Sequence, residues 1–377
     1  MIGIQGKYLC SFNLNDKLDF IREEDLSKFI IIEECGNILP YFQLVFKSPD
    51  RELPNYLNEG IILKAKFGKD SDSLDDLQLV IHSMMAYRTG DDYIVYNITG
   101  LYYKIDYLDT RIFITDKING ATALKQIGSK FFNVDSNLSE TADSMYWKQY
   151  NISHKKFIND IWLYTYIPES FISIGIDIKG NMKIRDIKKL LSKSTTDWDL
   201  GNNRDVKNHI DYDGDYVITS QAGFINAWLG AGRNKFLYDL DAGNGLIQNE
   251  DVKPLMALTR KLLINANREK KAFENGIINE NVHENYWRAY LRNIISLAIF
   301  STVKLTWSFN NDYRDIHVLD TILFKESAPT GNKISSSEYS SGIYINTKVS
   351  RILSQKSMVT IVESCREGFN QPEGDLK

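Results

Sequence analysis

Side chains that alternate between apolar and polar are the feature that most limits what this chain can fold into. In residues 63–67, Leu63, Ala65 and Phe67 alternate with two lysines, and the same spacing returns in residues 77–81. Successive side chains of a strand point to opposite faces, so period two predicts strands with one buried face. The chain is therefore expected to begin as an antiparallel, half-buried sheet.

Strand-like segments dominate both ends of the chain. Residues 91–114, "DDYIVYNITGLYYKIDYLDTRIFI", are rich in Tyr, Ile, Val and Thr, which suit a pleated surface. Polar turns such as "FGKDSDS" and "RTGDD" separate the early segments. Residues 302–366 return to the same character, interrupted by the Ser-rich "APTGNKISSSEYSSG". Strands at this spacing favour small barrels or sandwiches, and no repeat of short fixed period is present.

The character changes near residue 117. The segment "DKINGATALKQIGSKFF" places Ala123, Leu124, Ile127 and Phe131 at helical spacing. A polar link, "NVDSNLSETADS", follows it. Further on, "SFISIGIDIKGNMKIRDI" alternates Ile with small or polar residues and has "KGN" at its centre. This pattern predicts a β-hairpin.

Between the polar link and the hairpin, "YWKQYNISHKKFINDIW" predicts a capped helix. Ser153 is a favoured N-cap residue for a helix that begins at the next position. Phe157, Ile161 and Trp162 fall on one stripe with Ile158 and Thr165 and are expected to face inward, while the lysines at 155 and 156 face solvent. Pro168 is expected to stop the helix. The stretch therefore looks like scaffolding.

A polar, turn-rich segment from 193 to 215 marks a boundary. Strand-like "YVITSQAGFINAWLG" follows it, and "KFLYDLD" also resembles a strand. Residues 250–300 are expected to be mainly helical, in two runs. The first has Pro254 near its start and Gly276 near its end, and the second is "ENVHENYWRAYLRNIISLAIFS".

Composition narrows the class of function. Lys and Arg number 45 against 49 Asp and Glu, a net charge of −4, whereas dedicated nucleic-acid binders are usually basic. No apolar run approaches membrane length, and the first residues do not form a signal peptide pattern. Cys10, Cys35 and Cys365 form neither a disulfide framework nor a zinc ribbon, so free thiols are expected.

No motif specifies catalytic, cofactor-binding or metal-binding residues. Asp211, Asp213 and Asp215 resemble the start of a calcium loop, but Gly214 and Ala222 break its pattern, so a solvated turn is favoured. The segment "GAGRNKF" lacks the third glycine of a dinucleotide fingerprint and is interpreted as a β-turn. The five histidines form no metal-ligand spacing. Acid pairs are interpreted as surface charge; they are Glu23 with Glu24 and Glu33 with Glu34.

The capped helix and its lead-in resemble a known family. "QYNISHKKFI" resembles the Gln-Tyr-Asn-x-Ser-x-x-x-Phe-Leu segment of phage baseplate hub proteins and of the hub half of type VI secretion spike proteins. The matching residues include Gln149, Asn151, Ser153 and Phe157, with Ile158 in place of Leu. The order of elements on either side is also similar to the family, except between 201 and 290, where the match is poor.

The resemblance implies an α+β, mainly β fold with two tail-tube-like antiparallel β-barrels and an inserted α/β domain. The expected domains are an N-terminal barrel (1–116), an α/β insertion (117–200), a β connector that includes part of the second barrel (201–250), a helical segment (251–300) and the rest of the second barrel with a short tail (301–377). Gln149, Asn151, Ser153, Phe157, Ile161 and Trp162 are expected to cap and anchor the helix.

The resemblance also implies a non-enzymatic structural role. Such a hub is a homotrimer that joins a hexameric tail tube to a trimeric spike around a channel. Its expected partners are a separate spike protein, tail tube or distal tail proteins and other baseplate proteins. Genome DNA would only pass through, and no stable membrane binding or cofactor is expected. The expected location is the virion tail, after assembly in the host cytoplasm.

Two other classes of function stay open from the residues alone. Scattered acids are compatible with a hydrolase of cell-envelope polysaccharide. An aromatic content of 12% is compatible with a β-rich tail protein that binds surface carbohydrate.

Overall fold

The computed structural model describes 9–14, 21, 23–68, 75–88, 92–200, 209–210, 216–220, 234–239, 243–249, 272–278, 281–310, 315–325, 340–354 and 357–368. The strands of the first part are β1 (Leu9–Leu14), β2 (Leu26–Glu34), β3 (Tyr41–Ser48), β4 (Ile62–Gly68), β5 (Asp75–Arg88) and β6 (Ile94–Tyr102), with short 3-10 turns at Glu23–Asp25 and Leu53–Asn55.

The middle of the chain combines short strands with helices. Its elements are α1 (Ile105–Leu108), β7 (Thr110–Ile118), α2 (Gly120–Gly128), β8 (Asn133–Ser136), β9 (Met145–Ser153), α3 (His154–Tyr164), β10 (Ile172–Ile176), β11 (Asn181–Asp186) and α4 (Ile187–Leu191). The last part holds β12 (Trp198–Leu200), β13 (Tyr216–Ser220), β14 (Asn234–Asp239), β15 (Asn244–Asn249), β16 (Ala272–Ile278), α6 (Tyr286–Phe300), β17 (Val303–Asn310), β18 (Thr321–Phe324), β19 (Gly342–Leu353) and β20 (Met358–Arg366).

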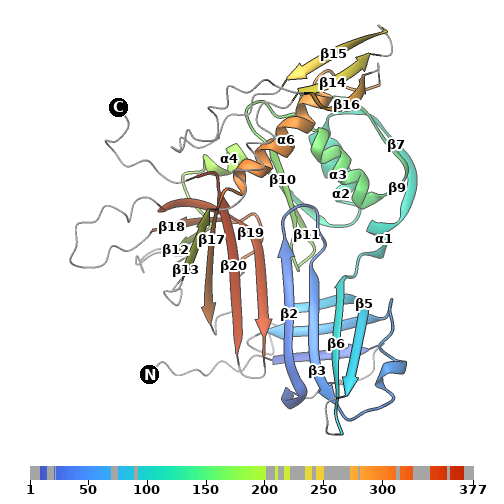
Figure 1. Ribbon diagram of the computed structural model, residues 1–377, viewed down its shortest axis with the longest axis vertical. Coiled ribbons are helices and arrows are strands. Elements are labelled where there is room, and N and C mark those ends of the chain that lie inside the picture. The colour runs from blue at the N-terminus through green and yellow to red at the C-terminus, as the bar shows by residue number, and fades with distance from the viewer. Residues whose placement is uncertain are drawn as a thin grey trace, which may run out of the picture.

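A single 12-stranded sheet contains strands from both ends of the chain. Its first section runs in the order β1-β4-β5-β6-β3-β2, and its second in the order β12-β18-β19-β20-β17-β13. β2 pairs with β19 in antiparallel orientation and joins the two sections. Figure 1 shows the strands from β13 to β5 side by side across the molecule. The mainly β fold and the large antiparallel sheet agree with the prediction.

Each section curls around its own core. In the first section, the rings of Phe12 on β1 and Phe29 on β2 lie 5.2 Å apart, although these strands stand at opposite ends of the pairing order. In the second, the rings of Tyr216 on β13 and Phe324 on β18 lie 5.0 Å apart. Among the described strands, no pairing joins β1 to β2 or β12 to β13. The two expected barrels are therefore curled sections of one sheet in this part of the chain.

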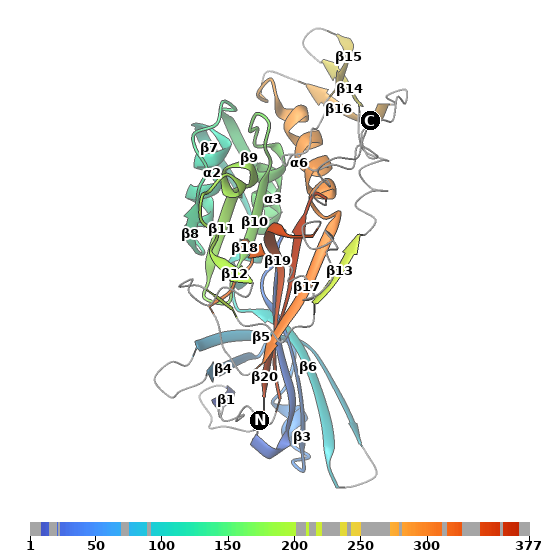
Figure 2. The same cartoon turned by 90° about the vertical axis from the view of Figure 1, so that its left-hand side faces the viewer.

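The middle of the chain forms an α/β layer above the first section, as Figure 2 shows. β10 and β11 form the expected hairpin, and β8 adds to β11 in parallel orientation. β7 and β9 form a separate two-stranded ribbon. The sequence did not indicate β8 or β9, which lie where a polar link and lead-in were expected. The expected domain boundary after residue 116 falls inside β7.

The last part of the chain confirms one predicted helix and corrects another. α6 forms where the second helical run was predicted. The first run was expected to reach Gly276, yet β16 occupies Ala272–Ile278 and pairs in parallel with β14. Hydrogen bonds to a neighbouring strand outweigh local helix propensity there; residues 250–271 lie outside the described part. Within the described helices, none is long and apolar enough to cross a membrane.

Candidate functional site

The two sections of the sheet meet along one edge of β19. Its first residues, Gly342–Ile345, pair with β18, and its last residues, Lys348–Leu353, pair with β2. Between these pairings, the backbone N–H of Cys35 donates to the carbonyl of Thr347 at 2.9 Å. One strand therefore passes from the second section to the first within two residues, and the side chains at this point hold both sections.

A buried carboxylate lies at this junction. Glu33 on β2 is fully buried, and its Oε1 accepts a hydrogen bond from Nη1 of Arg351 at 2.9 Å. His317 Nδ1 lies 2.9 Å from the same oxygen. The backbone N–H groups of Ile178 and Val318 also donate to this carboxylate, each at 3.2 Å. Glu33 thus ties together β2, β19, the β10–β11 turn and the segment before β18.

The electrostatics of this cluster favour its charged form. Burial acts to raise the pKa of Glu33, but the charges of Arg351 and His317 and the hydrogen bonds outweigh it and lower that pKa to about 2. Burial acts to lower the pKa of His317, but Glu33 and Asp315 raise it to about 9. A buried charge is stable only when it is paired and hydrogen-bonded. The cluster therefore works as a fixed ionic clamp.

The prediction that the Glu33–Glu34 pair is surface charge is wrong for Glu33. Phe29, Ile31 and Glu33 occupy the buried face of β2, while Glu34 is only half-buried. The period-two pattern already placed Glu33 in phase with Phe29 and Ile31, so a signal existed. The partners Arg351 and His317 lie about three hundred residues away in sequence and gave none.

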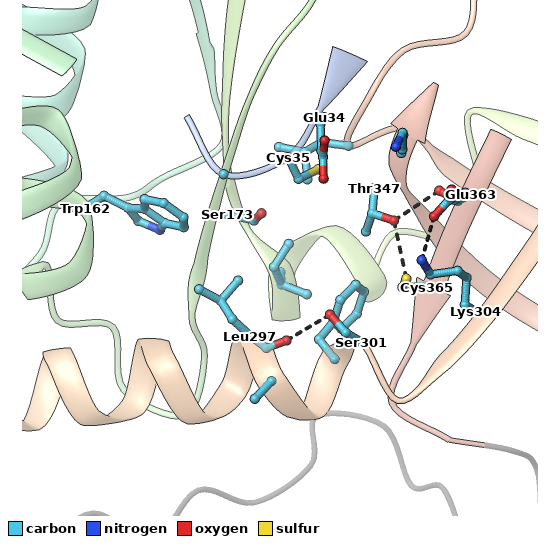
Figure 3. A pocket seen from close by; sticks show the side chains of 16 residues that line it. Glu34, Cys35, Trp162, Ser173, Leu297, Ser301, Lys304, Thr347, Glu363 and Cys365 are labelled. Atoms are coloured by element: carbon cyan, nitrogen blue, oxygen red, sulfur yellow. Dashed lines mark hydrogen bonds and ion pairs between the residues drawn. The ribbon is translucent and has the colours of Figure 1, made fainter. Parts of the chain in front are cut away.

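A cavity of about 630 Å³ lies beside the clamp, between the sheet and α6 (Figure 3). Cys35 and Cys365 both line it. At its edge, Lys304 Nζ lies 2.6 Å from a carboxylate oxygen of Glu363. Burial raises the pKa of the Cys35 thiol, which also lies near Cys365, and burial raises that of Cys365. Because the thiolate is the nucleophilic form, these free thiols lack the properties of catalytic cysteines.

The residues predicted to cap and anchor the middle helix do not form one site. Ser153 is the N-cap of α3, and its hydroxyl accepts a hydrogen bond from the N–H of Lys156 at 3.2 Å. Phe157 and Ile161 are buried in the core of the α/β layer. Trp162 is buried as well, and its Nε1 donates to the carbonyl of Ile172 at 2.7 Å. Of the six predicted residues, Trp162 alone lines the cavity.

The lead-in residues support the turn into α3. Gln149 is fully buried, and its Nε2 donates to the carbonyl of Ile152 at 2.6 Å. Asn151 is exposed and has a φ of 50°, a left-handed conformation that asparagine tolerates better than most residues. Together they bend the chain from β9 into the helix.

A second contact, unforeseen from the sequence, connects α3 to the β2–β3 turn. Asn37 is buried, and its Nδ2 donates to the carbonyl of Lys155 at 3.1 Å and to Oδ1 of Asn159 at 2.8 Å. The hydroxyl of Tyr107 donates to Oδ1 of the same Asn37. One side chain from the first section therefore binds the first turns of α3, which fixes the α/β layer relative to the sheet.

An exposed apolar surface covers the outer face of the β7–β9 ribbon. Ile112 and Tyr150 pair across the two strands and are 76% and 61% exposed. Ile114 and Tyr146 lie on the same face and are also exposed. The opposite face of the ribbon packs on the core through residues such as Trp147. Contiguous apolar patches of this kind are typical of protein interaction surfaces.

Two sequence motifs fall outside the described residues. These are the aspartates at 211, 213 and 215 and the glycines at 230 and 232. Within the described ranges, no group of three or more His, Cys, Asp or Glu side chains is arranged to hold a metal ion.

Comparison with known proteins gives similarity in fold without similarity in sequence. No family model matches the chain, and no curated protein sequence matches it. A tail protein from Neisseria meningitidis superposes with a TM-score of 0.57 at 9% identity, over 96% of this chain and 97% of that one. The 43 kDa tail protein of prophage MuSo2 from Shewanella oneidensis gives 0.52 at 11% identity, over 95% and 96%.

A third similar structure comes from a secretion machine. It is an Escherichia coli component of the type VI secretion system that is itself structurally similar to the bacteriophage T4 tail proteins gp27 and gp5. The TM-score is 0.50 at 9% identity, over 96% of this chain and 79% of that one. The resemblance first seen in the α3 segment is therefore confirmed for the fold of nearly the whole chain, which is a fold of phage tail and type VI secretion proteins.

Proposed function

We propose that this chain is the structural hub of a phage tail baseplate or of a related contractile injection machine. In this role three copies form a ring that joins a hexameric tail tube to a trimeric spike around a central channel. The observation that carries the proposal is the pair of curled six-stranded sections, each with its own core. Three copies with two such units each would present six similar units to a sixfold tube.

The contacts at the junction support a role in which the hub stays intact under force. The two sections share β19, and the Glu33 clamp and the Asn37 contact hold the sections and α3 together. A hub must transmit force between tube and spike without coming apart. These contacts join the two sections to each other and to α3, so they resist separation of the parts. The six residues predicted to anchor α3 and the five domain ranges predicted from the sequence are part of this proposal.

The partners proposed are those of a hub. They are a separate spike protein, tail tube or distal tail proteins and other baseplate proteins, with DNA only in transit. The proposed location is the virion tail, after assembly in the host cytoplasm, and the role is non-enzymatic. A trimer would carry three times the net charge of −4, so the ring as a whole would not attract phosphate strongly.

Multi-angle light scattering tests the proposal directly. The purified chain, alone or mixed with candidate spike and tube proteins, is expected to give a mass of three chains or of a complex built on three chains. The same samples are assayed for binding and hydrolysis of cell-envelope polysaccharide. A chain that stays monomeric with both partners, or that cleaves polysaccharide, would contradict the hub function.

A further inference from the structure

The two sections of the sheet have the same topology. Numbered in chain order within each section, both follow the strand order 1-4-5-6-3-2. β5 therefore corresponds to β19, and β2 corresponds to β13. One pairing differs in direction, because β1 pairs with β4 antiparallel whereas β12 pairs with β18 in parallel. The shared order makes the chain an internal duplication at the level of topology.

The correspondence extends to the register. β5 pairs with β6 with a register shift between Ile81 and Ser83, and β19 pairs with β20 with a shift between Asn346 and Lys348. Each strand then continues for the same length to its hairpin, as Ser83–Arg88 in β5 and as Lys348–Leu353 in β19. β4 pairs with β5 only before the shift, and β18 pairs with β19 only before the shift.

Beyond the shift the two strands differ in their neighbours. Lys348–Leu353 pairs on its second edge with β2 of the other section. Ser83–Arg88 pairs with β6, and within the described residues no strand pairs with its second edge. Met85 and Tyr87 in this stretch are 54% and 48% exposed. We call Ser83–Arg88 the free half of β5. Its counterpart in β19, Lys348–Leu353, pairs with β2 on the same edge.

The strand that corresponds to β2 also has an edge that pairs with no other described strand. β13 pairs with β17, and among the described strands it has no second neighbour. Val217 on β13 is 59% exposed. Prolines and charged residues are the usual protection of an exposed strand edge. β13 contains neither, and the free half of β5 has one charged residue, Arg88, at its end. β13 and β5 stand at opposite sides of the molecule in Figure 1.

We propose that β13 of a second copy of this chain pairs with the free half of β5, and so repeats between copies the β2–β19 pairing found within one copy. This interface rests on the proposed hub function, which requires several copies in a ring. The two edges are different surfaces of the chain, so the contact is head-to-tail, the kind that generates rings. The strand that pairs here is assigned to a second copy of the chain because the same kind of pairing, β2 with β19, already exists within one copy.

The internal pairing also gives the register of the interface. Across the first section, Ile30 pairs with Gln43, and Gln43 pairs with Thr99 on the next strand. Across the second section, Val217 pairs with Thr306, and Thr306 pairs with Glu363 on the next strand. Thr99 and Glu363 are equivalent because they pair with Ser83 and Lys348, the first residues after each register shift. Val217 is therefore the equivalent of Ile30.

The partner of Val217 follows from the same equivalence. Ile30 pairs with Ile352 of β19, and Ile352 corresponds to Tyr87. Tyr87 is thus expected to pair with Val217 of the second copy, one of the aromatic and β-branched pairs that stabilise sheets. The facing of the side chains agrees, because both are exposed, while their neighbours Met84 and Ile218 pack on the two section cores.

Cysteine cross-linking tests this register in the full-length chain. The double variant Tyr87→Cys with Val217→Cys, oxidised with copper–phenanthroline, is expected to give covalent dimers and trimers on a non-reducing gel. Each single variant keeps the native thiols and serves as a control without a ladder. The pair Ala86→Cys with Val217→Cys is out of register and is expected to cross-link at least tenfold less.

A charge-insertion experiment tests the interface independently. The double variant Met85→Lys with Tyr87→Lys changes only exposed side chains, so it is expected to stay folded by circular dichroism and to lose the oligomer in light scattering. Ile105→Lys, at an exposed apolar residue of α1, is expected to keep it. If the chain is a trimer that neither cross-links in this register nor responds to the lysines, the interface is wrong and the hub proposal stands. If the chain stays monomeric with spike and tube, both fail.

Discussion

At Glu33, a carboxylate takes a position in the alternation of β2 that otherwise holds Phe29 and Ile31. An unpaired carboxylate there would cost several kcal/mol, but Arg351, His317 and two backbone N–H groups satisfy its oxygens. At this position, directional hydrogen bonds and ion pairs take the place of the apolar contacts that Phe29 and Ile31 make. Such bonds specify which strands meet, in addition to the register that the buried apolar face of β2 already favours.

His317 makes the stability of the protein depend on pH. Its pKa is raised to about 9 in the folded state, above the ordinary value of 6.5, by Glu33 and Asp315 against the effect of burial. Its contribution is therefore complete below pH ~6.5 and is lost as the pH rises towards 9. The free energy of unfolding is expected to fall by on the order of 3 kcal/mol across this range in urea melts.

The matched control is a histidine outside the clamp. His317→Gln is expected to remove most of this pH dependence, whereas His82→Gln, at an exposed position on β5, is expected to keep it. An unchanged slope in the His317→Gln protein would show that the clamp is not protonated as described.

At the scale of the element, α3 is the part whose sequence and structure agree most closely. The cap at Ser153 and the buried stripe follow from spacing within one helix, and both are present. The strand that precedes it was missed because β9 alternates around polar residues such as Gln149, which is buried through a local hydrogen bond. Pairing with β7, distant in sequence, makes this segment a strand.

Two substitutions in α3 test its packing and its cap separately. Phe157→Ala is expected to destabilise the protein by about 3–5 kcal/mol, because the side chain is 2% exposed in the core of the α/β layer. Ser153→Ala is expected to cost about 1 kcal/mol through the lost hydrogen bond to Lys156. Lys156→Ala, at an exposed position of the same turn, is the control and is expected to stay within about 0.5 kcal/mol. Equal effects of all three in denaturant melts would contradict this description of the helix.

At the scale of the molecule, two units of the same topology are fused through one long strand. β19 belongs to the second section by its pairing with β18 and β20, and to the junction by its pairing with β2. The clamp joins Arg351 on this strand to Glu33 on β2, so damage to the clamp is expected to affect both sections. The units are thus expected to be coupled in stability as well as in position.

Hydrogen exchange can measure this coupling. Glu33→Gln removes the buried negative charge that faces Arg351 and His317 and is expected to cost about 3–5 kcal/mol. Amide exchange is expected to increase in β3 and in β17, which lie in different sections. Glu34→Gln, at the adjacent half-buried position, is expected to leave β17 unchanged. An increase confined to β3 would show that the sections are independent.

The sequence by itself determined the features that depend on near neighbours along the chain. Alternation located β4 and part of β5, helical patterns located α2, α3 and α6, and side-chain type located the cap at Ser153. These signals are local because the periods of strands and helices span only a few residues. The absence of a catalytic pattern and the family resemblance were also properties of the sequence.

Only the tertiary structure decided how those elements combine. It buried Glu33 against His317 and Arg351, made a strand of Ala272–Ile278 and joined two curled sections through β2 and β19. It also left the free half of β5 and one edge of β13 without a second strand among the described residues. The Glu33 contacts and the β2–β19 pairing join residues about three hundred positions apart. The energies of all these pairings come from hydrogen bonds and burial that exist only once both partners are in place.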